Sequence, residues 1–106
     1  MKLITAQELH QRLQAGESQP FLLDVREPHE FKYCHINGSV NLPMNQTPAR
    51  LAELDPARET VVICHHGMRS AQVAHFLINQ GFSDISNLTG GVAAWATQVD
   101  PTMPTY

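Results

Sequence analysis

The sequence predicts an α/β fold: a mostly parallel, five-stranded central sheet flanked by helices on both faces. Short apolar runs of strand length alternate along the 106 residues with segments of helical periodicity. The connections are short and are marked by glycine, proline or capping residues. With 42% hydrophobic residues the chain can bury one core, but it is too short for two. We expect one domain over residues 1–99 and a C-terminal tail over residues 100–106.

Five apolar runs are the predicted strands. The clearest is Thr60–Cys64, which is rich in β-branched residues and uncharged, as expected of a central strand in a parallel sheet. The full set is Leu3–Ile4, Phe21–Val25, Ser39–Leu42, Thr60–Cys64 and Ile85–Leu88.

Capping signals predict the helices between these strands. Thr5 and Glu8 form a capping box at the start of the first one. Thr47 stands before Pro48, a pairing typical of an N-cap followed by proline in the first turn. The predicted helical segments run from Thr5 to Gly16, from Glu27 to Tyr33 (a turn or a helix), from Thr47 to about Leu54, from Ser70 to Gly81 and from Gly90 to Val99.

Charge and hydropathy exclude two classes of partner. Seven Lys and Arg face ten Asp and Glu, for a net charge of −3, and no basic run is present, which disfavours nucleic acid as a ligand. No stretch approaches the ~18–20 apolar residues that a membrane-crossing helix needs. The N-terminal residues lack the apolar segment of a secretory signal, so we expect a cytoplasmic protein without membrane contact.

The two cysteines, Cys34 and Cys64, are expected to be free thiols in a reducing compartment, with a disulfide between them as the alternative. Zinc held by Cys34, His35, Cys64 and one of the adjacent histidines is a further alternative. Close ligand pairs of the kind found in zinc sites are missing from the sequence. We therefore do not expect a zinc site.

One segment carries the chemistry. A buried strand ends at Cys64, and a helix begins about six residues later, so the loop between them lies at the carboxyl edge of the sheet, where α/β proteins bind ligands. Gly67 permits a tight turn, and backbone amides at the helix start form a cradle suited to an anion. Cys64 at this cradle is the candidate nucleophile. The expected substrate-binding residues are His65, His66, Gly67, Met68, Arg69 and Ser70.

Four motifs in order along the chain resemble those of the rhodanese (thiosulfate sulfurtransferase-like) family, and the resemblance spans almost the whole sequence. They are D-V-R-E at 24–27, E-F at 30–31 followed by H-I-N-G-S-V-N-L-P at 35–43, C-H-H-G-M-R at 64–69 and L-T-G-G-V-A-A-W at 88–95. The resemblance implies a single rhodanese-like domain with Cys64 at the nucleophile position.

Two positions depart from the family pattern. Ser39 replaces an alanine of nearly equal size, and Cys34 replaces a glycine. A glycine there indicates positive φ, where cysteine is strained unless the backbone adapts. Two interpretations of Cys34 stay open, a second functional thiol and a spacer. For Arg69 two interpretations stay open: it contacts the donor anion, or it points to solvent. We expect Asp24 and Arg26 to form a structural ion pair.

The resemblance implies a sulfurtransferase that needs neither a metal nor an organic cofactor. The Cys64 thiolate takes the outer sulfur of a small anionic donor such as thiosulfate, or of another persulfide donor, and passes it to cyanide, a thiol or a protein acceptor. A non-catalytic binding or regulatory module with the same fold is one alternative. A cysteine phosphatase or arsenate reductase is another, although those loops have arginine six residues after the cysteine, where this chain has Ser70.

Overall fold

A computed structural model describes residues 1–16 and 18–106. The expected sheet is present: five parallel strands in the order β1-β5-β4-β2-β3. Their bounds are β1 Lys2–Ile4, β2 Phe21–Asp24, β3 Val40–Asn41, β4 Thr60–Ile63 and β5 Ile85–Leu88. The chain builds outward from β2 to β3 and then returns to place β4 between β2 and β5. Cys64 therefore follows a central strand, at the place where the strand order reverses.

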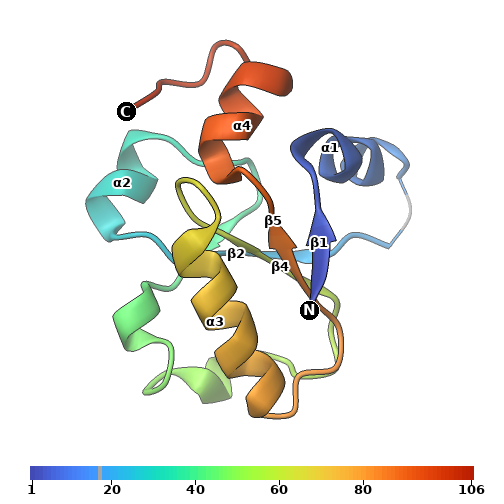
Figure 1. Cartoon of the computed structure of the whole chain (residues 1–106), viewed down its shortest axis with the longest axis vertical. Helices are drawn as coiled ribbons and strands as arrows, with labels where there is room; N and C mark the ends of the chain where they lie inside the picture. The colour runs from blue at the N-terminus through green and yellow to red at the C-terminus, as the bar shows by residue number, and fades with distance from the viewer. Residues whose placement is uncertain (17) are drawn as a thin grey trace.

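Four α-helices cover both faces of the sheet, as the sequence predicts (Figure 1). Their bounds are α1 Ala6–Gln14, α2 Pro28–Tyr33, α3 Met68–Asn79 and α4 Gly91–Gln98. The predicted capping box is confirmed, because the Glu8 amide donates to Thr5 Oγ1 and the Thr5 amide donates to the Glu8 carboxylate. None of the helices in the described part of the chain is long and apolar enough to cross a membrane.

The period-two alternation of β4 divides the core into two layers. Val61 and Ile63 pack on the face covered by α1 and α4, together with Leu9 and Trp95. Val62 and Cys64 pack on the opposite face with residues of α3. The sulfur-bearing residue is thus part of the core, and only 1% of its surface is exposed.

The predicted helix from Thr47 to Leu54 is wrong. Two short 3₁₀ turns stand there, η1 Met44–Gln46 and η2 Leu51–Glu53. The buried Thr47 hydroxyl donates backwards to the Pro43 carbonyl over 3.2 Å, so its side chain closes the first turn and does not cap a following helix.

Two further expectations need correction. Helix α3 begins at Met68, two residues earlier than predicted, because Gly67 takes the N-cap position with a left-handed φ of 105°. Cys34 has extended backbone with φ −160°, and no described residue other than glycine has positive φ, so the strain expected at Cys34 is absent.

The segment 100–106 lies against the domain. Met103 is buried in the core layer beneath α1 and α4. The chain then reaches the loop that follows β4, where the Tyr106 ring stacks on His65 with 3.9 Å between ring centroids. The last residues of the chain are therefore part of the surroundings of Cys64.

Candidate functional site

Cys64 Sγ receives hydrogen bonds from its own loop. The Gly67 amide donates to it over 3.0 Å, and Ser70 Oγ lies 3.3 Å away. Burial raises the pKa of the thiol, but hydrogen bonds from the Ser70 hydroxyl and from the amides of Ser70, Gly67 and His66 lower it, and the net pKa is below the ordinary value. The loop therefore favours the thiolate, the nucleophilic form of cysteine.

Asn87 on β5 contacts the loop that follows Cys64 at two residues. Its Nδ2 donates to the Gly67 carbonyl over 3.1 Å, and its Oδ1 lies 2.5 Å from Ser70 Oγ. The Gly67 carbonyl can only accept, so the orientation of the Asn87 amide is determined. Sequence reasoning missed Asn87. The available signal was an asparagine inside a fully buried parallel strand, where an apolar residue is expected.

Helix α4 supports the loop from the other side. The amides of Val92 and Ala93 donate to the carbonyls of Cys64 and His65 over 3.0 and 3.1 Å. Gly91 makes this approach possible, since a Cβ there would lie 2.4 Å from both carbonyl oxygens. Gly91, the first residue of α4, is thus explained by its contact with the cysteine loop.

The expected substrate-binding residues fall into different environments. The His65 ring stacks on the Tyr106 ring and also contacts the His66 ring, which is tilted by 33° to it. Burial and the neighbouring His66 lower the pKa of His65, which keeps its ring neutral near pH 7. Met68 is 77% exposed and does not pack on the sheet. Of the six residues, Gly67 lies 3.0 Å from the sulfur through its amide and Ser70 lies 3.3 Å from it through its hydroxyl. The His66 amide also donates to the sulfur.

Arg69 forms an ion pair that neither interpretation above included, and its contact with a donor anion stays a prediction. Its guanidinium forms two parallel hydrogen bonds with Glu30 of α2, at 2.8 and 2.9 Å. The Tyr106 hydroxyl donates to the same carboxylate over 2.8 Å and accepts from Arg26 Nη1 over 2.9 Å. Hydrogen bonds from Arg69 lower the pKa of Glu30 to about 2 despite its burial. Glu30 and Tyr106 were not expected at the site.

Asp24 and Arg26 form the predicted structural ion pair. Both side chains are fully buried, and Arg26 Nη2 lies 2.6 Å from Asp24 Oδ2. The same nitrogen donates to the Cys34 carbonyl over 2.7 Å. The pair thus fixes the chain after β2 next to the start of the segment that follows α2.

A rhodanese-like domain model matches residues 5–98. The chain belongs to the rhodanese-like family. It is 36% identical to thiosulfate sulfurtransferase GlpE of Stutzerimonas stutzeri, covering 89% of this chain and 84% of that protein. It is 40% identical over its whole length to rhodanese-like/PpiC domain-containing protein 12 of Arabidopsis thaliana, of which it spans 38%. The crystal structure of a rhodanese-like domain protein from Staphylococcus aureus matches it with a TM-score of 0.86, at 29% identity, over 100% of this chain and 99% of that one.

Both cysteines of this rhodanese-like domain are free thiols, so the alternative of a disulfide is not what the structure contains. Cys34 is buried, with its sulfur 3.9 Å from Arg26 Nη1. Residues 1–16 and 18–106 contain no group of three His, Cys, Asp or Glu side chains placed to hold a metal ion.

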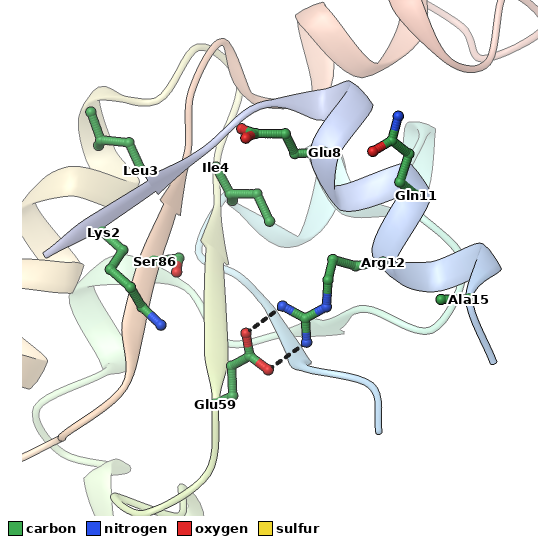
Figure 2. A pocket seen from close by; sticks show the side chains of 9 residues that line it. All are labelled: Lys2, Leu3, Ile4, Glu8, Gln11, Arg12, Ala15, Glu59 and Ser86. Carbon is green, nitrogen blue, oxygen red and sulfur yellow. Dashed lines mark hydrogen bonds and ion pairs between the residues drawn. The ribbon is translucent and has the colours of Figure 1, made fainter. Parts of the chain in front are cut away.

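Two hollows of the rhodanese-like domain differ in their relation to the loop. One of about 460 Å³ lies between β1 and α1 and is crossed by the Arg12–Glu59 ion pair (Figure 2). Glu59 precedes β4, so this hollow is near the amino ends of the strands, away from Cys64. The other, of about 320 Å³, adjoins the loop. Its lining residues are His65, Val92, Ala93, Thr97, Pro104, Thr105 and Tyr106.

Proposed function

We propose that this rhodanese-like domain is a sulfurtransferase that carries a sulfane sulfur as a persulfide on Cys64. The observation that carries the proposal is a buried sulfur at the carboxyl end of a central strand, with an amide and a hydroxyl directed at it. The name of the GlpE relative, a thiosulfate sulfurtransferase, supports thiosulfate as one donor.

The first half-reaction transfers a sulfur atom to the enzyme. The Cys64 thiolate attacks the outer sulfur of thiosulfate, a bond forms between Sγ and that sulfur, and the sulfur–sulfur bond of thiosulfate breaks. The electron pair of the broken bond leaves with sulfite. Since little of Cys64 is exposed, a single small atom such as this outer sulfur is the group that reaches it.

The second half-reaction removes this sulfur from the enzyme. Cyanide or a thiolate attacks the outer persulfide sulfur, and the electron pair of the Sγ–S bond returns to Cys64 as the thiolate. Lowering a thiol's pKa raises its rate of attack only a few-fold, since nucleophilicity falls at the same time. The larger contribution of the loop is electrostatic stabilisation of the anion that sits on the sulfur before and after transfer.

The positions of the remaining candidates define their roles in this proposal. Amides of His66, Gly67 and Ser70 hold the negative charge of the sulfur, and the Ser70 hydroxyl adds a fourth donor. His65 and Met68 form the rim, and Arg69 acts through its pair with Glu30. The Cys64 thiol must be reduced to accept the sulfur, which suits a reducing compartment such as the cytoplasm.

Steady-state kinetics test the proposal. With thiosulfate and cyanide as substrates, we expect thiocyanate to form with parallel double-reciprocal lines, the pattern of a two-step exchange through a covalent enzyme form. Cys64→Ser should abolish this activity, and the matched Cys34→Ser variant should retain it. Activity that persists in Cys64→Ser would overturn the proposal. Absence of sulfur transfer from both thiosulfate and an alkyl persulfide would instead indicate a binding module.

A further inference from the structure

The positive charge nearest the loop is already paired. Arg69 is close enough for its charge to interact with the Cys64 thiolate, yet both of its terminal nitrogens bond to Glu30. The side chains of Arg69 and Glu30 are 33% and 11% exposed, so water screens this pair only in part. A negatively charged donor that approaches Cys64 therefore meets the charges of both partners.

Glu30 is fixed in this arrangement. Besides the two bonds from Arg69, its Oε1 accepts from the Glu27 amide over 2.9 Å and its Oε2 accepts from the Tyr106 hydroxyl over 2.8 Å. Four donors thus hold one carboxylate. Its pKa of about 2 keeps it ionised at any pH where the enzyme would work. Glu30 is in consequence a permanent negative charge beside the site.

The other charges around the loop follow the same pattern. The buried Arg26 is matched by the buried Asp24 at 2.6 Å. The neutral ring of His65 adds no charge near pH 7. In each of the two Arg–carboxylate pairs the positive and negative charges cancel. The remaining attraction for an anion comes from the backbone amides and the Ser70 hydroxyl, and these donors already bond to the Cys64 sulfur.

We propose that Glu30 is a specificity-determining residue, which offsets the charge of Arg69 and so directs the site toward sulfur donors that carry one negative charge or none. This inference rests on the proposed sulfurtransferase activity. The repulsion between a donor and the Glu30 carboxylate is proportional to the negative charge of the donor. Compared with a site in which Arg69 is unpaired, thiosulfate, with two charges, loses twice the attraction that persulfides and thiosulfonates, with one charge, lose.

Methanethiosulfonate provides the matched monoanionic probe. The Cys64 thiolate attacks its terminal sulfur, the Sγ–S bond forms, the bond between that sulfur and the sulfonyl sulfur breaks, and methanesulfinate leaves with the electron pair. The enzyme product is the same persulfide that thiosulfate produces. The two donors differ by one charge, and the comparison between variants removes the difference between their leaving groups.

The test is kcat/KM for each donor at low ionic strength, in wild type and in Glu30→Gln. Removing the negative charge of this partly screened pair should raise kcat/KM about threefold for the monoanion and about tenfold for the dianion. The logarithm of the change should be twice as large for thiosulfate. Arg69→Gln, which leaves Glu30 without its partner, should lower both values with the same twofold ratio of logarithms.

Glu53→Gln is the matched control, because Glu53 forms the same kind of bidentate pair with Arg50 at an exposed position. This variant should leave kcat/KM unchanged for both donors. Equal changes for the two donors in both site variants would show that Glu30 and Arg69 only hold the loop in place, and would overturn the inference. If wild type forms no persulfide with either donor or with an alkyl persulfide, the proposed function itself fails, an outcome distinct from equal changes.

Discussion

Asn87 Oδ1 lies 2.5 Å from Ser70 Oγ, and that hydroxyl lies 3.3 Å from Cys64 Sγ. The Ser70 hydroxyl has a single proton, so it donates to Asn87 or to the sulfur but not fully to both. A protonated Cys64 can donate to Ser70, which then donates to Asn87. A thiolate instead draws the Ser70 proton toward itself. Asn87 is thus coupled to the protonation of the sulfur without touching it.

The isosteric change Asn87→Asp should make Cys64 less reactive. A carboxylate still accepts from Ser70, but it brings negative charge toward the thiolate and sets an oxygen against the Gly67 carbonyl. We expect alkylation of Cys64 by iodoacetamide at pH 7 to slow about three- to tenfold, with its pH profile displaced upward.

Asn41→Asp is the control for this change, because Asn41 Nδ2 donates to two backbone carbonyls, those of Asp24 and Arg26, away from the sulfur. It should weaken the fold in a similar way and leave the alkylation profile of Cys64 in place. Equal displacement of the profile in the two variants would refute the coupling.

Gly91→Ala should destabilise the protein by more than about 3 kcal/mol or prevent folding. The added Cβ would lie 2.4 Å from the carbonyls of Cys64 and His65, and φ is +58°. Gly38→Ala has comparable positive φ but open space around the Cβ, so it should lose only about 1–2 kcal/mol. Urea unfolding of both variants measures the difference. Equal losses would mean that backbone strain alone, without close approach of α4 to the loop, requires Gly91.

Arg26→Met should destabilise the fold by about 3–5 kcal/mol, because it leaves the fully buried Asp24 carboxylate without its partner. The double variant Asp24→Asn, Arg26→Met removes both charges and should lose less than the sum of the single changes. Chemical denaturation of the four proteins gives this coupling energy. Additive losses would show that the two side chains do not depend on each other.

Glu30 should make stability depend on acid. Its pKa in the folded protein is about 2, below the ordinary 4.5, so its contribution is fully present above pH 4.5 and is lost as the pH falls toward 2. Urea unfolding at about pH 5 and about pH 3 should show a smaller loss in Glu30→Gln than in wild type. Glu53→Gln, at an exposed pair, should retain nearly the wild-type loss. The same loss in all three proteins would contradict the assignment.

Local patterns were sufficient to predict the sheet and the position of the cysteine. The β-branched run before Cys64 predicts a central parallel strand, and the Thr5–Glu8 box predicts the first helix, since both depend on neighbours in sequence. Thr47 has the composition of an N-cap, but its hydroxyl bonds to a preceding carbonyl, a choice made by burial. Local propensity does not distinguish a threonine that caps a following helix from one that bonds to a preceding carbonyl.

The support around Cys64 was not predictable in this way. Ser70 and Asn87 are 17 positions apart, Arg69 and Glu30 are 39 apart, and Arg26 and Tyr106 are 80 apart. These contacts depend on how parallel strands and their crossover helices bring distant segments to one edge of the sheet. The sequence therefore predicted the position of Cys64 and its loop but not the residues that set their charge and geometry.

Mass spectrometry of the reduced protein after treatment with thiosulfate tests the central claim most directly. We predict a gain of one sulfur atom per chain, located on the peptide that contains Cys64 and removed by cyanide. Cys34→Ser should gain the sulfur as wild type does, and Cys64→Ser should not. A gain that persists in Cys64→Ser, or no gain in wild type from thiosulfate, methanethiosulfonate or an alkyl persulfide, would contradict the assignment of Cys64 as the sulfur carrier.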